Sequence, residues 1–203
     1  MDTETAKNHE LYLERKALYK TFGYDVDQER GFVLEQAKPL DGKIVEAGTG
    51  KGHFALCLAA EGRPFVTFDI SPEEQSFARL NLAYFGLDHL ADFRIENAEH
   101  TGFADQSFDI ILSVNVLHHL SDPYKVLDEF IRITSAHGKI VLADFTDEGF
   151  KIMDRIHGLE GKTHEVGKVG LNEAQAYFIQ KGFSVKKTRS AYQCVLVASR
   201  KSS

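Results

Sequence analysis

The chain has 203 residues, a formal net charge of −6 and an apolar fraction of 43%, which are ordinary values for a globular protein. The acidic balance disfavours a nucleic-acid partner, because proteins that follow a phosphate backbone usually carry a basic surface. No apolar run approaches the roughly 20 residues of a membrane span, and the N-terminus lacks the regions of a signal peptide. Two cysteines, Cys57 and Cys194, are too few for a disulfide framework. We expect a single domain in a reducing cytoplasm, without a membrane partner.

The predicted elements begin with two helices and continue as alternating strands and helices. Residues 1–37 favour helix, with a break near Phe22–Asp25 and an end before Pro39. Apolar runs predict strands at residues 44–46, 65–69, 91–96, 108–113 and 139–145. Helices are predicted at residues 52–61, 71–86 and 122–138, where Gly138 closes the third. A last helix at 172–182 precedes strands at 183–189 and 191–199.

This alternation implies a parallel sheet with helices on both faces. The last two strands are joined too closely for a parallel crossover, so they pair antiparallel or do not pair. Ligands of such sheets sit beyond the carboxyl ends of the strands, and residues 146–170 leave from such an end. We divide the domain into an N-terminal helical cap (1–37), a ligand-binding core (40–145), this lid-like insertion and a final helix with a strand pair (171–203).

The segment from Lys43 to Phe54 predicts a small-ligand site. A short apolar run ends in Glu46, and glycines follow at alternate positions, Gly48, Gly50 and Gly52. A strand, a tight glycine turn and a helix together hold a ligand against exposed backbone at the helix N-terminus. A dinucleotide loop needs glycine where His53 stands, and the leading acid would repel a pyrophosphate. An acid here suits a ligand that carries positive charge.

A second acid, Asp69, ends the next strand nineteen residues beyond Gly50, where a carboxylate can accept hydrogen bonds from both hydroxyls of a ribose. The combined pattern resembles the class I S-adenosylmethionine-dependent methyltransferases. The resemblance covers about residues 40–145 and continues through residues 94–98, 108–120 and 138–145. It implies a Rossmann-like three-layer α/β/α fold with a seven-stranded, mostly parallel sheet and an antiparallel final strand. It also implies S-adenosylmethionine as the cofactor.

The resemblance assigns cofactor contacts to the residues that follow the strands. Glu46 would favour the ammonium and sulfonium end, the glycine turn would approach the methionine part, and Asp69 would bind the ribose. Asn97 stands where the family usually has an acid, although its amide oxygen can still accept a hydrogen bond from the adenine amino group. Each residue also has a plain structural use, such as a tight turn, a surface acid or a core contact. The implied cofactor-binding residues are Glu46, Gly48, Thr49, Gly50, Gly52, Asp69, Ile70, Asn97, Ala98 and Ser113.

No strong catalytic motif is visible, and methyl transfer from a sulfonium needs none, because alignment supplies much of the rate. His118 and His119 belong to a segment that resembles small-molecule methyltransferases of the ubiquinone-biosynthesis type. We expect one of them to face the cofactor and the other to pack or cap. A neutral histidine could take a proton from an oxygen or nitrogen nucleophile, and a purely structural histidine is an equal alternative.

The substrate contacts are expected outside the core. Tyr24 could close over the site, and His157 and His164 could form a polar substrate pocket in the lid-like insertion. Gly158 and Gly161 argue against a continuous helix there, and a solvated loop is the plainer use of the segment. The insertion has no two-histidine-one-carboxylate motif at a recognised spacing, so we expect no metal.

The resulting functional hypothesis is an S-adenosylmethionine-dependent methyltransferase that acts on a small molecule by in-line displacement. A protein acceptor is a further option, and nucleic acid is a poorer one. The alternatives are a non-catalytic or regulatory S-adenosylmethionine-binding protein and a nicotinamide-dependent dehydrogenase, which the glycine spacing and Glu46 disfavour. The sequence does not predict the acceptor, the attacking atom or the oligomeric state.

Overall fold

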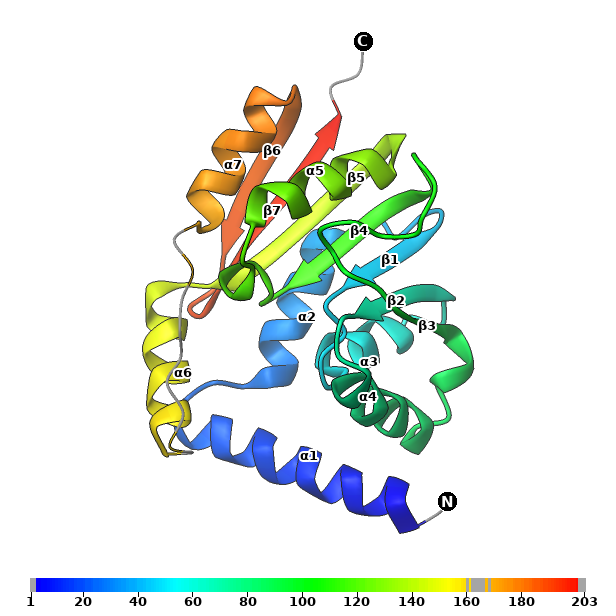
Figure 1. Ribbon diagram of the computed structural model, residues 1–203. Helices are drawn as coiled ribbons and strands as arrows, with labels where there is room; N and C mark the ends of the chain where they lie inside the picture. The colour runs from blue at the N-terminus through cyan, green and yellow to red at the C-terminus, as the bar shows by residue number, and fades with distance from the viewer. Residues whose placement is uncertain (1–2, 160, 162–166, 168, 201–203) are drawn as a thin grey trace.

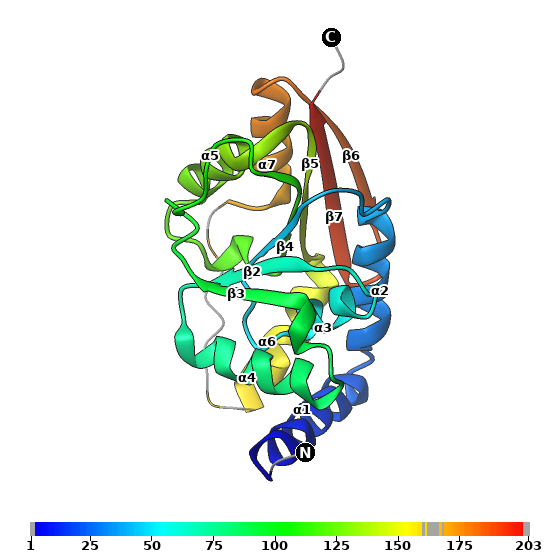
Figure 2. The same cartoon turned by 90° about the vertical axis from the view of Figure 1, so that its right-hand side faces the viewer.

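A computed structural model describes residues 3–159, 161, 167 and 169–200 of the chain. Seven strands form one sheet, with helices on both faces (Figures 1 and 2). The strands are β1 (Ile44–Ala47), β2 (Phe65–Asp69), β3 (Ala91–Ile95), β4 (Phe108–Val114), β5 (Thr134–Phe145), β6 (Phe183–Arg189) and β7 (Gln193–Arg200). The helices are α1 (Thr3–Thr21), α2 (Val26–Ala37), α3 (His53–Ala59), α4 (Pro72–Tyr84), α5 (Pro123–Ile133), α6 (Asp147–Leu159) and α7 (Leu171–Gln180), with short turns η1 (Asp88–Leu90) and η2 (Leu117–His119).

The strand order is β3-β2-β1-β4-β5-β7-β6. β7 pairs antiparallel with both of its neighbours, and the other pairs are parallel. The predicted fold, with a mostly parallel sheet and an antiparallel final strand, is therefore confirmed. The chain runs outward from β1 to β3 and then returns to β4, which pairs with β1 on its other side. This reversal creates a crevice at the carboxyl ends of β1 and β4, the usual ligand position in such sheets.

Two apolar clusters, one on each face of the sheet, form the core. Ile110 and Leu112 of β4 pack in the cluster under α2, α3 and α4, whereas Ile111 packs in the cluster under α5 and α7. This alternation follows from the two-residue period of a strand. Because both faces of the central strands are covered, those strands are apolar on both sides, and their polar residues concentrate at their carboxyl ends.

The helix predicted to extend to Gly138 ends earlier, at Ile133, and β5 begins at Thr134. Gly138 lies inside β5, where a β-carbon would lie 2.8 Å from the carbonyl oxygen of Asp109. The pairing of β4 with β5 shifts register at this level, between Phe108 and Ile110. The glycine therefore marks a close approach within an irregular strand pair and not a helix end, so this part of the prediction was wrong.

Residues 147–159 form helix α6, where the sequence favoured a solvated loop. Its buried residues Ile152, Met153 and Ile156 pack against Tyr24 and Val26 from the N-terminal region. The helix includes two glycines despite their low helix propensity, because burial of this apolar face outweighs it. The loop prediction was wrong for this part of the segment. In Figure 1, α6 stands beside the turn that joins α1 to α2.

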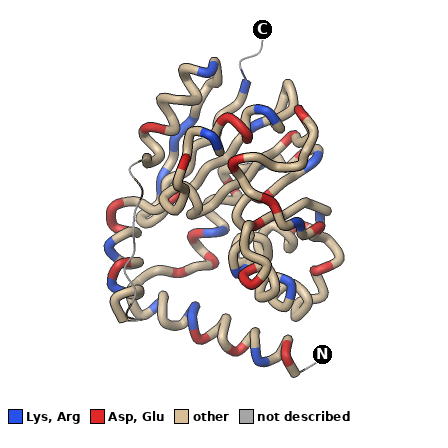
Figure 3. Tube along the Cα trace, viewed as in Figure 1, with Lys and Arg blue, Asp and Glu red and all other residues tan. Residues whose placement is uncertain are grey.

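Both signs of charge are interspersed along α1 and α6 (Figure 3), unlike the basic stripe typical of nucleic-acid-binding proteins. Within the described ranges, the structure contains no helix that is both long and apolar enough to cross a membrane.

Candidate active site

A cavity of about 670 Å³ opens at the carboxyl ends of β1, β2 and β4, within the size range of small-molecule and cofactor sites. Gly52 and Ser113 are not among its described lining residues: Gly52 packs against α4, and Ser113 is buried in β4. The predicted cofactor residues that the structure does bring together around this cavity are Glu46, Gly48, Thr49, Gly50, Asp69, Ile70, Asn97 and Ala98.

The glycine turn serves the packing of the chain as well as the cavity. Gly48 has a φ of 84°, and a β-carbon there would collide with Cγ2 of Val116. Gly52 has a φ of 82°, and a β-carbon there would lie 2.9 Å from Cα of Ala78 in α4. Gly50 faces open space at the cavity wall. Two of the three glycines thus allow close packing within the protein, and Gly50 leaves room for a ligand.

Glu46 is buried with an exposed fraction of 1%, so it is not a surface acid at a strand end. The hydroxyl of Thr67 donates to its Oε2 at 2.6 Å, and Oγ1 of Thr49 lies 2.6 Å from Oγ1 of Thr67. Nε2 of Gln75 donates to Oγ1 of Thr49 at 3.2 Å and to the carbonyl of Arg94 in β3 at 2.8 Å, which extends these buried contacts. Burial raises the pKa of Glu46 to about 8, although the Thr67 hydrogen bond and the charge of Arg30 oppose this shift. A cationic ligand in the cavity would favour its ionised form.

Asp69 holds together the turns that follow β1 and β2. Its Oδ2 accepts from the backbone N–H of Gly50 at 2.8 Å, and its Oδ1 accepts from that of Ser71 at 2.9 Å. Ser71 in turn caps α4 by accepting from the backbone N–H of Glu74 at 3.2 Å. Each carboxylate oxygen of Asp69 keeps a second lone pair that could accept from a hydroxyl. Asp69 therefore has a structural role at the entry to α4, and its ribose contact stays a prediction.

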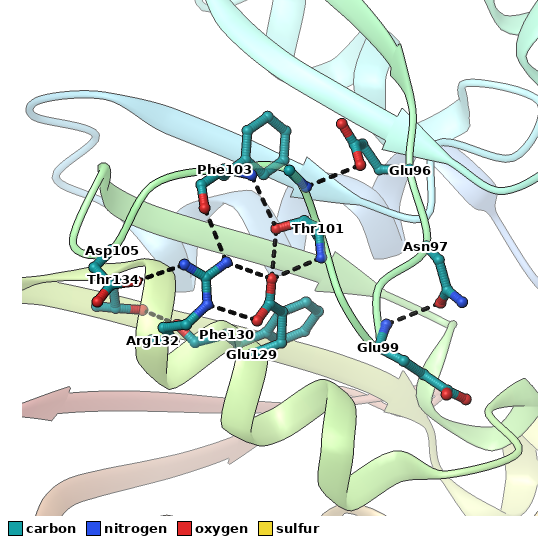
Figure 4. Close-up of polar contacts among 11 residues, drawn as sticks. Glu96, Asn97, Glu99, Thr101, Phe103, Asp105, Glu129, Phe130, Arg132 and Thr134 are labelled. Atoms are coloured by element: carbon teal, nitrogen blue, oxygen red, sulfur yellow. Dashed lines mark hydrogen bonds and ion pairs between the residues drawn. The ribbon is translucent and has the colours of Figure 1, made fainter.

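Asn97 lies on the exposed loop after β3. Its Oδ1 accepts from the backbone N–H of Glu99 at 2.9 Å, which is an Asx turn (Figure 4). The next turn of the loop is held by Glu96, whose Oε2 accepts from the backbone N–H of Gly102 at 3.0 Å. The side-chain oxygen of Asn97 is therefore already used within the loop, and its adenine contact also stays a prediction.

An ion pair between the buried Glu129 and the half-buried Arg132 fixes the far end of this loop (Figure 4). Oε1 of Glu129 accepts from the backbone N–H and the hydroxyl of Thr101 at 2.7 and 2.6 Å, and it lies 2.6 Å from Nη2 of Arg132. Arg132 also donates to the carbonyl of Phe103 at 2.9 Å and to Asp105 at 2.6 Å. Burial opposes the charged form of Glu129, but the hydrogen bonds from Arg132 and Thr101 outweigh it and lower its pKa to about 2.

The two consecutive histidines have different surroundings. His118 is buried, its Nδ1 lies 2.6 Å from Oδ1 of Asp144, and its backbone N–H donates to Oδ2 of the same carboxylate at 3.2 Å. His119 is exposed and lines the large cavity. The two ring centroids are 3.9 Å apart. His119 thus lies at the cavity and His118 packs against Asp144, while a cofactor contact or a catalytic role for either of them stays a prediction.

A second cavity of about 160 Å³ adjoins the first. Tyr24 and His157, both predicted substrate contacts, lie in its wall, whereas the third predicted contact, His164, lies outside the described residues. The hydroxyl of Tyr24 accepts from Nε2 of Gln193 at 3.0 Å. The described part of the chain contains no group of three or more histidine, cysteine or acidic residues that could hold a metal ion. The residues that line both cavities are Arg30, His53, Asn115 and His119.

Arg30, in α2, is the main residue that the sequence analysis missed. Asn115, which has a φ of 58°, can accept hydrogen bonds through its amide oxygen from both terminal nitrogens of Arg30, each at 2.9 Å. No carboxylate in the described ranges forms an ion pair with Arg30, and its buried Nε has no hydrogen-bond partner there. A signal for it exists in the sequence, because Arg30 stands between Val26 and Leu34 on the apolar stripe of α2.

His53, the second missed residue, begins α3 directly after the glycine turn. Burial and the nearby charge of Arg30 lower its pKa to about 3, so it is neutral at pH 7. Tyr12 of α1 stacks on it with ring centroids 5.1 Å apart. α1 is attached to α4 through Asn8, whose Nδ2 donates to Oδ1 of Asn81 at 2.8 Å. The N-terminal helix therefore covers the outer side of the glycine turn.

Comparison with known proteins gives one family. Residues 45–142 match the methyltransferase-domain family. YcgJ of Bacillus subtilis, an uncharacterised methyltransferase, is 26% identical over 182 residues, which cover 87% of this chain and 69% of YcgJ. The crystal structure of YcgJ matches with a TM-score of 0.69 at 18% identity, over 86% of this chain and 99% of that chain.

Two further matches are a methyltransferase and a cyclase. The 27-O-demethylrifamycin SV methyltransferase of Amycolatopsis mediterranei is 28% identical over 161 residues, which cover 74% of this chain but only 57% of that enzyme. The crystal structure of the cyclase SpnF matches with a TM-score of 0.67 at 16% identity, over 86% of this chain and 81% of that chain. The family match over residues 45–142, the sheet order and the acid-and-glycine cavity together support a class I S-adenosylmethionine-dependent methyltransferase, with S-adenosylmethionine as its cofactor.

Proposed function

We propose that this protein transfers the methyl group of S-adenosylmethionine to a nucleophilic atom of a small-molecule acceptor that binds in the 160 Å³ cavity. The observation that carries the proposal is the junction of the two cavities at Arg30, His53, Asn115 and His119. A donor in the larger cavity and an acceptor in the smaller one would meet there. Holding two reactants in line in this way supplies much of the acceleration of a methyl transfer.

The proposed orientation of the cofactor follows the chemistry of the large cavity. Ile70, Asn97 and Ala98 would surround the adenine, and Asp69 would accept from the ribose hydroxyls. The buried carboxyl of Glu46 would favour the positively charged methionine end next to Gly50. The bound cofactor supplies an electrophilic methyl group on a positive sulfur, and the described residues bind it, orient it and exclude water.

We assign the two histidines different roles in this proposal. His119 is the histidine beside the transferred methyl group, because it lines both cavities. It would accept the proton of a hydroxyl or amine nucleophile. His118, held by Asp144, would orient the ring of His119 through their 3.9 Å contact. The small volume of the acceptor cavity, about 160 Å³, supports a small molecule and not a polymer. We also propose that the protein lies in the cytoplasm, which agrees with its two free cysteines.

A second candidate function is binding of S-adenosylmethionine without methyl transfer. The similarity to SpnF supports this second candidate, because SpnF is a cyclase and shows that proteins with this fold do not all transfer methyl groups. Calorimetric titration with S-adenosylmethionine and S-adenosylhomocysteine, followed by mass-spectrometric detection of S-adenosylhomocysteine with phenol, thiol, carboxylate and amine acceptors, separates the two candidates. Binding with acceptor-dependent turnover supports the proposal. Binding with no turnover favours the second candidate, and no binding contradicts both.

A further inference from the structure

The lining of the acceptor cavity has an uneven charge. Among its described lining residues are one guanidinium, from Arg30, four imidazoles and no aspartate or glutamate. Behind this wall, Asp144 is occupied by His118 and by the backbone N–H of Phe145, which donates to it at 2.9 Å, and Glu29 accepts from the hydroxyl of Ser190. Glu46 lines the other cavity, which shares Arg30 with this one. The described wall therefore suits an anionic acceptor better than a cationic one.

The size and lining of the cavity indicate a single ring. Its volume of about 160 Å³ is close to that of an engineered protein cavity of about 150 Å³ that binds one benzene. Tyr19, Tyr24 and Phe145 supply aromatic walls, with 6.0 Å between the ring centroids of Tyr24 and Phe145, and Met153 supplies an adaptable apolar side. This lining is apolar and aromatic around a few polar groups, as in other small-molecule sites.

Arg30 adds an electrostatic requirement. Asn115, the partner that it can reach at 2.9 Å, is neutral, and no described carboxylate pairs with it. The positive sulfur of a bound cofactor would bring a second positive charge toward this guanidinium. Like charges at short range repel, and an anion between them is attracted by both. An acceptor with an ionised oxygen at this position would satisfy Arg30 and attack the methyl group from the same place.

We propose that the acceptor is a single-ring compound whose ring hydroxyl is ionised beside Arg30 and is the atom that becomes methylated. This inference rests on the proposed function. The hydroxyl proton leaves to solvent through the exposed His119. The oxygen then forms a bond to the methyl carbon while the carbon–sulfur bond breaks, and sulfur keeps the electron pair. The products are a methyl ether and S-adenosylhomocysteine.

The test uses three neutral single-ring phenols whose hydroxyl group ionises with increasing difficulty: para-nitrophenol, para-chlorophenol and para-methoxyphenol. At pH 7 we expect kcat/KM for methyl transfer to fall in that order, by about tenfold or more between the first and the last, because the ionised oxygen is the form that Arg30 attracts. A bicyclic naphthol should be a poorer substrate than para-chlorophenol. Equal kcat/KM for the three phenols, or naphthol as an equal of para-chlorophenol, overturns the inference.

Variants of Arg30 show whether its charge favours the ionised hydroxyl. Arg30→Met should shift the rising limb of the pH profile of kcat/KM for para-chlorophenol to higher pH, and Arg30→Lys should keep it in place. The control is Arg63→Met, which makes the same change in net charge at an exposed residue outside both cavities. If Arg30→Met weakens S-adenosylhomocysteine binding but leaves this pH profile unchanged, Arg30 serves the carboxylate of the cofactor and the inference is wrong. Failure of the wild-type protein to bind S-adenosylhomocysteine contradicts the proposed function itself.

Discussion

The two adjoining cavities are built from different parts of the chain. The cofactor cavity is lined mainly by turns that directly follow β1, β2, β3 and β4, so consecutive strands deliver its residues to one edge of the sheet. The acceptor cavity is lined by α1, α2, the start of α3, the turn after β4, the end of β5 and α6, which come from distant parts of the sequence. The first cavity depends on local motifs, whereas the second exists only after distant helices have packed together.

The cavities also differ in how their polar groups are satisfied. Asp69 accepts two backbone N–H groups, and Glu46 accepts from Thr67, so the acids of the cofactor cavity have partners within the chain. Arg30, in the wall that the two cavities share, can reach the neutral amide of Asn115 and pairs with no described carboxylate. The difference teaches that the acids of the cofactor cavity are held before a ligand binds, while the shared wall holds an arginine whose reachable partner is neutral.

The largest expected effect tests the cofactor cavity. Asp69→Ala should weaken S-adenosylhomocysteine binding by about 100-fold or more, because two hydrogen bonds to a charged acceptor are lost. It also frees the backbone N–H of Gly50 that the carboxylate holds. Calorimetry measures the affinity, with Asp92→Ala, an exposed acid on β3, as the control. An unchanged affinity would remove Asp69 from the ribose contact.

The loop that carries Asn97 should depend on Glu129. Glu129→Ala should reduce the free energy of unfolding by about 3 kcal/mol, because it leaves Arg132 and Thr101 without their buried partner. Since the pKa of Glu129 is lowered to about 2, its contribution is present above pH 4.5 and is lost as the pH falls toward 2. Urea unfolding at pH 7 and pH 3 measures both effects. The control is Glu148→Ala, which removes an exposed acid from an ion pair with Lys151. An equal decrease in the free energy of unfolding for both variants would show that the burial of Glu129 does not matter.

The buried acid of the cofactor cavity should make binding dependent on pH. Because the pKa of Glu46 is raised to about 8 without ligand, S-adenosylmethionine should bind more tightly as the pH rises from 6 to 8, by up to about tenfold per unit. The same shift means that the unliganded fold binds more protons than the unfolded chain between pH 4.5 and 8, so its stability falls as the pH rises through that window. Glu46→Gln should flatten both profiles in calorimetry and thermal unfolding. Unaltered profiles would show that another group titrates.

The smallest expected effect tests the acceptor cavity. Tyr24→Phe removes the hydroxyl that accepts from Gln193, which should cost about 1 kcal/mol of stability. If the two cavities are separable, KM for the acceptor should rise while the affinity for S-adenosylhomocysteine stays constant. Steady-state kinetics and calorimetry on the same variant make this comparison. If the variant weakens S-adenosylhomocysteine binding as much as it raises KM for the acceptor, the two cavities act as one unit.

The predictability of each region from sequence follows the same division. The glycine turn, the Ser71 cap and the strand that ends in Asp69 have local signals, so the sheet and most of the cofactor-cavity residues could be predicted. α6 could not be predicted, because its apolar face gains its partners Tyr24 and Val26 only in the folded protein. The irregular strand at Gly138 likewise depends on the backbone of β4, which is adjacent only in the folded sheet.

The position of α2 and α6 in the chain has an evolutionary consequence. Both helices lie outside the continuous segment from β1 to β5, one before it and one after it, and together they supply four of the eleven described residues of the acceptor wall, Val26, Arg30, Met153 and His157. Exchange of these two flanking segments between relatives would therefore graft a new acceptor preference onto an unchanged cofactor core. Such chimaeras would keep every β1 to β5 pairing, and substrate range would diversify without redesign of the sheet.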